Sequence, residues 1–421
     1  MKLLLLLAAL AGYFWWRRDR GEPHSLYFQQ LQNTLKEAGV CYPRMVLDLD
    51  RLDGNIEKVK NFVGDTSHLR VVGKSLPSFE LLEYIQNKLG TNRLMVFHQP
   101  FLKQLLVRFP QADFLIGKPF PVVAVAGVLE ASREQELGAV ERIQWLVDTR
   151  ERLMQYLELA KEQKVCLKIS IELDVGLHRG GLNQLWELEP LLQVIAENPD
   201  NLKFSGFMGY EPQLAKVPFF LANKQDEIRK SVMDEYREFV DFVRLRHPDL
   251  YSDDLCFNAG GSMTYRLYQD MDSIPANEIA LGSAFVKPVD FDLDTLDVHQ
   301  EAAFIATPVL KSDNQMNIPF LEKLSPLWKS LTPNMAKSFY IYGGWWKAKP
   351  VSPKGLSNNP IFGRSTNQEL FMGSEKTDLK VDDFVFLRPT QSEYVFLHFG
   401  RILLVRKGEV VGEWATFNQD Y

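Results

Sequence analysis

Three polar side chains of this sequence have the types and positions that an active site requires. Lys74 directly follows a short β-rich run, and burial at a strand end lowers the pKa of an amine and lets it form a Schiff base. Arg179 precedes two glycines and has the planar donor set that binds an acidic group or a cofactor oxygen. Tyr210 can stack on a ring or take part in proton transfer. These positions alone also suit a lysine that extends to solvent, a surface arginine paired with Asp174 and a packed tyrosine.

Two glycine-containing segments follow late β-rich runs and predict a phosphate site. Residues 258–265 read Asn-Ala-Gly-Gly-Ser-Met-Thr-Tyr, and residues 280–285 read Ala-Leu-Gly-Ser-Ala-Phe. The backbone N–H groups of such loops can surround a phosphate. One loop alone says little because Gly-Gly turns are common, but two on adjacent late strands form the usual phosphate site of a barrel.

The elements that must position these residues alternate between β-rich runs and stretches of helical periodicity. Strands are expected at 45–49, 70–72, 94–97, 114–116, 143–147, 167–173, 204–207 and 256–258. About eight such units over roughly 250 residues predict an α/β fold, a (β/α)8 TIM-type barrel whose strand ends carry the chemistry. A doubly wound open sheet is the alternative, and the lack of a Gly-x-Gly-x-x-Gly motif after the first strand disfavours it.

The pattern changes after about residue 300, where short runs rich in β-branched and aromatic residues replace the helical periodicity. These runs cover 384–387, 394–399, 402–406 and 410–414, and Lys407, Gly408 and Glu409 form a hairpin signal between the last two. The sequence therefore predicts a barrel over residues 40–298 and a smaller C-terminal β domain over residues 299–421.

The hydrophobic N-terminal segment, residues 1–20, stands apart from both domains. An apolar run at 3–16 is followed by Arg17 and Arg18, and its length of about 14 residues is below the roughly 20 that span a bilayer. Tryptophans beside arginines are typical of a membrane interface, and positive charge after the run favours a cytoplasmic body. We expect a cytoplasmic protein with residues 3–16 as a candidate tether to the inner face of the membrane. A cleaved signal peptide is the alternative, although no Ala-x-Ala site follows.

Composition narrows the possible partners. The formal net charge is −6, and lysine and arginine are scattered along the chain, so a nucleic-acid-binding role is disfavoured. The three cysteines form no Cys-x-x-Cys motif, which favours a reducing compartment over a disulfide framework.

The order of these motifs resembles that of the alanine-racemase-type barrels, the fold-type III pyridoxal 5'-phosphate (PLP) enzymes. Residues 43–50 are similar to the opening strand, and Lys74 falls where those enzymes keep their PLP lysine. Residues 174–181 are similar to the Asp-x-Gly-x-x-Arg-x-Gly element of the family, and residues 206–211, 260–265 and 282–283 match in order. The resemblance covers about residues 40–420 and is closest to the D-threonine aldolase and D-serine dehydratase branch.

The resemblance implies a role for each candidate residue. Lys74 would hold PLP as a Schiff base and act as a base at Cα, while Arg179 would approach the ring or its phenolic oxygen. Tyr210 would line the ring, and Gln99 would contact the cofactor or the substrate. The phosphate would be held by residues of the two glycine loops: Gly260, Gly261, Ser262 and Ser283, with Tyr265 close by.

The implied activity is that of a lyase on D-amino acids with a β-hydroxyl, by retro-aldol cleavage or by dehydration and deamination. A PLP-dependent amino-acid racemase is the alternative, and it needs a second base such as Tyr340, Tyr342 or Tyr394 from the β domain of a partner subunit. A small PLP carrier is disfavoured because such carriers lack a β domain. The resemblance further implies a homodimer that acts on a small-molecule amino-acid substrate.

One position departs from the pattern of that branch, in which a His-x-Cys or His-x-Asp pair after a proline binds a divalent metal. Here Gln391 takes the place of the histidine and Glu393 keeps a carboxylate. An amide oxygen is a poor ligand for a zinc-like ion, and Glu393 is only a weak candidate for a hard ion such as Mg²⁺. We therefore expect no tight metal site, which leaves activation of the substrate hydroxyl to Glu393, His398 or His178.

Overall fold

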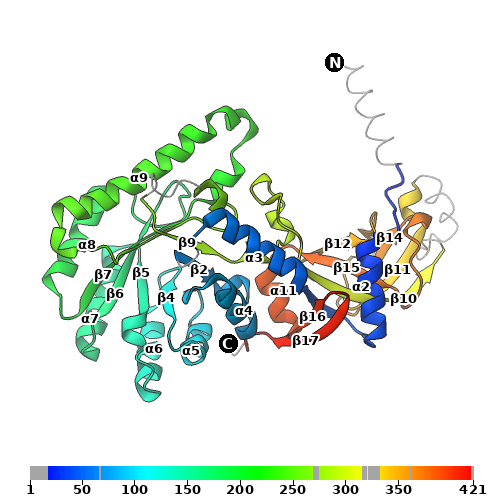
Figure 1. Cartoon of the computed structure of the whole chain (residues 1–421), viewed down its shortest axis with the longest axis horizontal. Helices are drawn as coiled ribbons and strands as arrows, with labels where there is room; N and C mark the ends of the chain where they lie inside the picture. Colours follow the sequence, from blue (N-terminus) through cyan, green and yellow to red (C-terminus); the bar gives the residue numbers. More distant parts are fainter. Residues whose placement is uncertain are drawn as a thin grey trace. The chain divides into compact units, whose positions relative to one another are not determined.

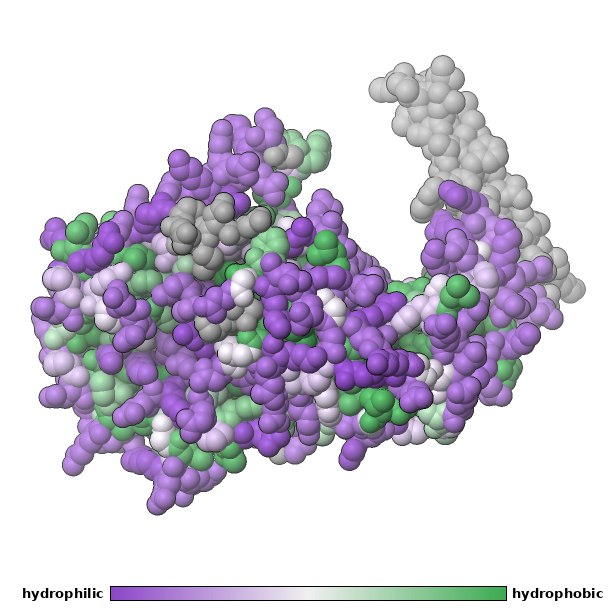
Figure 2. Space-filling view, in the orientation of Figure 1, coloured by the Kyte–Doolittle hydropathy of each residue, from purple (hydrophilic) through white to green (hydrophobic). Residues whose placement is uncertain are grey.

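The computed structural model describes residues 18–65, 68–268, 275–314, 320, 332–359 and 363–418 (Figure 1). They form two compact units, one drawn from residues 53–287, 291–300 and 415 onward, the other from residues up to 52, 288–290 and 301–414. Among the described residues, we find no helix whose length and apolar character would let it span a bilayer, and the candidate tether at 3–16 lies outside them. Figure 2 shows a face with mainly hydrophilic residues and smaller hydrophobic patches among them.

The larger unit contains a closed barrel of eight parallel strands, which confirms the predicted fold class. Around it, helices alternate with the strands and lie on the outside (Figure 1). The strands are β2 (Leu69–Val72), β3 (Arg93–Val96), β4 (Asp113–Ile116), β5 (Ile143–Val147), β6 (Leu167–Leu173), β7 (Leu202–Gly209), β8 (Cys256–Ala259) and β9 (Glu278–Leu281). The helices are α3 (Leu49–Val63), which begins in the smaller unit, and α4 (Phe79–Leu89), α5 (Gln99–Arg108), α6 (Val122–Glu134), α7 (Arg150–Gln163), α8 (Leu185–Glu197) and α9 (Gln225–Arg246).

Local signals fix where several of these helices begin and end. The Ser78 hydroxyl accepts a hydrogen bond from the Leu81 amide at the start of α4, and Thr149 does the same for Arg152 at the start of α7. Such caps satisfy donors that the first helical turn leaves unpaired. Helix α4 ends at Gly90, whose φ of +71° is the left-handed conformation that glycine adopts without steric cost.

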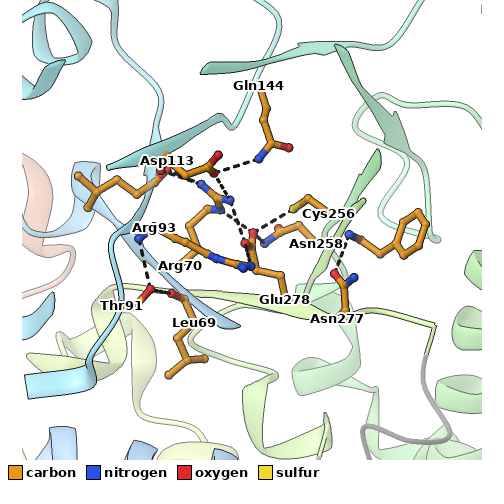
Figure 3. A network of polar contacts seen from close by, with 12 residues as sticks. Leu69, Arg70, Thr91, Arg93, Asp113, Gln144, Cys256, Asn258, Asn277 and Glu278 are labelled. Carbon is orange, nitrogen blue, oxygen red and sulfur yellow. Dashed lines mark hydrogen bonds and ion pairs between the residues drawn. The ribbon is translucent and has the colours of Figure 1, made fainter. Parts of the chain in front are cut away.

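The interior of the barrel is layered. At the amino-terminal ends of the strands, Arg70 donates from Nη2 to Glu278 Oε2 at 2.8 Å and to Asp113 Oδ1 at 2.6 Å (Figure 3). Arg93 donates from Nη1 to the same Glu278 oxygen at 2.9 Å. Next along the strands comes a hydrophobic cluster of buried residues: Val72, Met95, Leu115, Leu146, Met208, Cys256 and Ala280. Because the residues of this cluster are hydrophobic, we expect the polar side chains of an active site at the carboxyl ends of the strands.

The smaller unit is built on a nine-stranded sheet. Its strands are β1 (Arg44–Asp48), β10 (Ala303–Asp313), β11 (Lys337–Tyr342), β12 (Ala348–Ser352), β13 (Ser357–Asn358), β14 (Gln368–Gly373), β15 (Phe384–Pro389), β16 (Arg401–Arg406) and β17 (Glu409–Ala415). Helix α2 (Leu26–Glu37) buries Leu31 and Leu35 in the same cluster as Val46 and Phe386 of the sheet. Lys407 and Gly408 have φ of +50° and +78° between β16 and β17, so the predicted hairpin turn is confirmed.

Two expectations from the sequence are wrong. The strand expected at 45–49 inside the barrel range 40–298 is β1 of the smaller unit, where Met45 pairs with Ile305 and Ile402. The barrel has no place for it, because β9 pairs with β2 and closes the ring from Leu69 onward. The run 394–399 is not a strand but helix α11 (Ser392–Phe399), which ends at Gly400 in the left-handed conformation.

Candidate active site

Lys74 lies at the carboxyl end of β2, in the short 3-10 turn Gly73–Ser75. Its side chain is half-buried, and Nζ is 4.2 Å from the centroid of the Phe97 ring. A cation over an aromatic face at this distance is attracted by the electrons of the ring. The Phe97 ring itself occupies the space beside Gly117, where a β-carbon would lie 2.3 Å from the ring. Lys74 thus lies against the Phe97 ring, at the end of the barrel where enzymes of this architecture have their active sites.

The two glycine loops lie together beside the Lys74 turn. Ser262 Oγ accepts hydrogen bonds from the amides of Gly282, at 3.1 Å, and Ala284, at 3.0 Å. A β-carbon on Gly282 would lie 2.8 Å from Cβ of Ser75, so only glycine permits this approach. Because Ser262 accepts both bonds through its oxygen, its hydroxyl hydrogen can donate to an anion. Ser283 is buried at the start of the 3-10 turn Ser283–Phe285.

Tyr210 and Arg179 continue this arrangement on the neighbouring strands. A β-carbon on Gly261 would lie 2.7 Å from Cε2 of Tyr210, so the glycine backbone packs directly on the ring. The guanidinium carbon of Arg179 is 5.3 Å from the centroid of the same ring. Burial and the adjacent Glu211 raise the pKa of Tyr210, against the opposing effect of Arg179. Lys74, the two loops, Tyr210 and Arg179 therefore form one continuous set of contacts along the barrel rim.

The buried carboxyl group of Glu211 is hydrogen-bonded to the first glycine loop. Glu211 is fully buried and accepts hydrogen bonds from the Gly260 amide, at 3.2 Å, and the Thr264 hydroxyl, at 2.9 Å. Burial raises the pKa of Glu211, and these two donors oppose the rise. The Thr264 hydroxyl oxygen accepts in turn from the Gly261 amide at 3.1 Å. The loop is thus pre-formed by internal hydrogen bonds.

Two of the predicted cofactor residues take part in other contacts. The Tyr265 hydroxyl is buried and hydrogen-bonded to His299 Nε2 at 2.7 Å. Gln99 begins α5, and its Nε2 is 3.5 Å from the place of a β-carbon on Gly127 of α6. The contacts of these two side chains with His299 and Gly127 therefore lead away from the glycine loops.

Two carboxyl groups for which the sequence predicted no role, those of Asp148 and Glu172, lie at the rim of the barrel. Burial raises the pKa of Glu172 to about 7, helped by the negative charge of Asp148 and opposed by Arg179. Apolar and polar residues alternate along β6, and this alternation is the signal that could have placed Glu172 on the inner face of the barrel. The pairing of β6 with β5, which brings Asp148 close, is not visible in either segment alone.

The expected metal position lies in the smaller unit, at the start of α11. Gln391 Oε1 accepts a hydrogen bond from Lys347 Nζ at 3.0 Å. An ammonium at this distance repels a divalent cation, so the residues present do not fit the metal site of the related branch. Among the described residues, no group of three or more His, Cys, Asp or Glu side chains is placed to hold a metal ion.

Comparison with known proteins defines the family. Residues 47–286 match the family model described as alanine racemase, N-terminal domain. Similar solved structures include D-threonine aldolase from Filomicrobium marinum, with a TM-score of 0.67 and 15% identity over 89% of this chain and 96% of that chain. The D-threo-3-hydroxyaspartate dehydratase from Delftia sp. HT23 has a TM-score of 0.68 and 13% identity over 89% and 97% of the two chains.

An alanine racemase from Bacillus anthracis is similar with a TM-score of 0.65 and 15% identity, over 89% of this chain and 98% of that chain. A comparison with curated protein sequences finds no match. At these identities the solved structures establish the fold, whereas the family model covers more than half of the sequence. The chain therefore belongs to the alanine racemase N-terminal domain family, among the fold-type III PLP enzymes.

Proposed function

We propose that this chain is a PLP-dependent enzyme acting on amino acids, with Lys74 as the residue that binds the cofactor covalently. The observation that supports this most strongly is the continuous set of contacts from the Lys74 turn through Gly282, Ser262 and Gly261 to Tyr210. It combines an amine, a hydroxyl donor beside two glycine loops and an aromatic ring, which are the groups that PLP requires. When bound, PLP withdraws electrons from a bond at Cα of an amino acid.

Each residue of the site has a chemical task in this proposal. The amine of Lys74 holds the cofactor and moves a proton at Cα of the substrate. The Ser262 hydroxyl donates to the phosphate, beside the close packing of Gly261 on Tyr210 and of Gly282 on Ser75. The Arg179 guanidinium binds the phenolic oxygen of the ring, for which its planar donor set is suited. Tyr210 would line the ring.

For the substrate we propose a D-amino acid with a β-hydroxyl group, cleaved by a retro-aldol reaction or dehydrated and deaminated. The similarity of the whole fold to a D-threonine aldolase and a D-threo-3-hydroxyaspartate dehydratase supports this choice. An amino-acid racemase is the second candidate, which the similarity to an alanine racemase supports. It requires a second base, and the exposed Tyr342 and Tyr394 have the appropriate chemistry.

A substrate panel separates these activities. The purified protein is incubated with PLP and D-threonine or D-serine in deuterium oxide, and the products are followed by NMR. Glycine from D-threonine identifies the aldolase, and pyruvate from D-serine identifies the dehydratase. Exchange of the α-proton with inversion and without cleavage identifies the racemase. Lys74→Ala should abolish the activity. The control Lys161→Ala, on the exposed face of α7, should retain it. If the wild type turns over neither amino acid, the proposed lyase is contradicted.

A further inference from the structure

Asp148 and Glu172 lie side by side on the rim of the barrel. Strands β5 and β6 are parallel with Val147 opposite Ile171, so the next residues on each strand are Asp148 and Glu172. A β-carbon on Gly180 would lie 3.8 Å from Glu172 Oε2 and 3.9 Å from Asp148 Oδ2. The two carboxyl groups therefore converge on one point in front of Gly180, the residue after Arg179.

The charges around Glu172 come from the neighbouring elements. Asp148 follows β5, Asp174 and Arg179 follow β6, and Arg179 lies over the ring of Tyr210, which follows β7. Asp174 already has a partner, because its Oδ2 is 2.9 Å from His178 Nδ1 and its Oδ1 accepts from the His178 amide. The Arg179 guanidinium is therefore the positive charge that opposes the rise in the pKa of Glu172.

A second observation points to the same part of the barrel. Ser170 precedes Glu172 by two positions and faces the same side of β6, is fully buried, and its hydroxyl has no hydrogen-bond partner in the described part of the chain. A buried polar atom without a partner needs an explanation, and a functional role of its surroundings is one. Two carboxyl groups at close range do not both ionise readily, since the second negative charge is opposed by the first.

We propose that Glu172 carries a proton near neutral pH because the Asp148 carboxyl group lies beside it, and that Glu172 is a positioning residue that keeps Arg179 over Tyr210. The consequence for the cofactor depends on the proposed function. An anionic ring oxygen at Arg179 neutralises part of the charge that opposes protonation of Glu172. Binding of such a ligand therefore takes up a proton, and protonation in turn strengthens its binding, because the coupling between two sites is reciprocal.

The carboxyl pair is tested first without any cofactor. The chain is labelled with ¹³C at the glutamate side-chain carboxyl carbon, and the Glu172 signal is assigned by its loss in Glu172→Gln. We expect a titration midpoint at about pH 7 in the wild type. Asp148→Asn should lower this midpoint by about one unit or more, and Arg179→Gln should raise it. Glu158→Gln, on the exposed face of α7, should leave it unchanged.

A Glu172 midpoint in the ordinary range of glutamate, or one that Asp148→Asn does not move, would overturn the proposal. Asp148→Asn preserves side-chain shape, and circular dichroism of each variant verifies the fold. Because the pair is tested by opposite shifts in two variants, a general loss of structure cannot produce the expected result.

The coupling to the cofactor is tested with pyridoxine 5'-phosphate, which lacks the aldehyde and leaves Lys74 unmodified. Calorimetry at pH 7 in two buffers of different ionisation enthalpy measures the protons exchanged on binding. We expect the wild type to take up roughly half a proton more than Glu172→Gln, and equal exchange in both would overturn the coupling. If neither this compound nor PLP binds the wild type, the proposed function fails, while the NMR titration still decides whether the carboxyl pair exists.

Discussion

Replacement of Arg70 by methionine is expected to destabilise the barrel by about 3 kcal/mol. The Arg70 side chain is 1% exposed and that of Glu278 is fully buried, so the variant leaves a buried carboxylate without its main partner (Figure 3). One ion pair with charge centres ~4 Å apart contributes about 4 kcal/mol at an effective dielectric constant of ~20. Arg93 keeps its own bond to Glu278 at 2.9 Å and offsets part of this loss, which puts the expected value in the lower part of the usual range for a broken buried pair.

Urea unfolding followed by far-ultraviolet circular dichroism gives the free energy of unfolding. The double variant Arg70→Met with Glu278→Gln should recover part of the loss, because it removes the unpaired charge as well. Arg244→Met is the control, since Arg244 is 56% exposed and pairs with Asp241 on the surface of α9, where an ion pair contributes about 1 kcal/mol or less. A loss in Arg70→Met no larger than in this control would refute the reasoning.

Three further predictions concern the site and its surroundings. Gly261→Ala should weaken PLP binding at least about tenfold, since the new β-carbon meets the Tyr210 ring at 2.7 Å; an unchanged affinity in a PLP titration would contradict this. Burial lowers the pKa of His299 to about 4 from an ordinary 6.5, so the unfolded state binds more protons in this window and stability falls as the pH falls through it. His299→Gln should reduce the fall in the free energy of unfolding between pH 7 and pH 4 by at most about 3 kcal/mol. Unfolding free energies measured over this pH range test this, and parallel curves for the wild type and the variant would contradict it. EDTA should leave turnover unchanged, because the Lys347 ammonium is hydrogen-bonded to Gln391 at the expected metal position and repels a divalent cation. Stimulation of turnover by added Zn²⁺ or Mg²⁺ would contradict this.

The barrel and the place of Lys74 could be predicted because both depend on local patterns. Alternating β-rich and helical stretches predict the strands and helices one by one, and the geometry of a parallel barrel brings the residues after each strand to one end. Placing β1 required knowledge of its partners, because the mostly apolar run 45–49 suits an antiparallel or a parallel neighbour equally well. The structure pairs it with Ile305 and Ile402, which are distant in sequence.

The sequence alone does not predict where a side chain points or whether a short apolar run forms a strand or a helix. Residues 394–399 are mostly apolar, and a run of this length does not distinguish a strand from a helix. Tyr265 follows the first glycine loop in sequence, yet its hydroxyl bonds to His299, a partner that no motif reveals. Asp148 and Glu172 become neighbours only through the register of β5 and β6.

Covalent capture of the cofactor tests the central claim most directly. The purified protein is loaded with PLP, reduced with borohydride, digested and analysed by mass spectrometry. The reduced cofactor should be found on the peptide that contains Lys74, and Lys74→Ala should lose both the modification and the absorbance band of the bound cofactor. Cofactor attached to another lysine, or an absorbance band that persists in Lys74→Ala, would contradict the account.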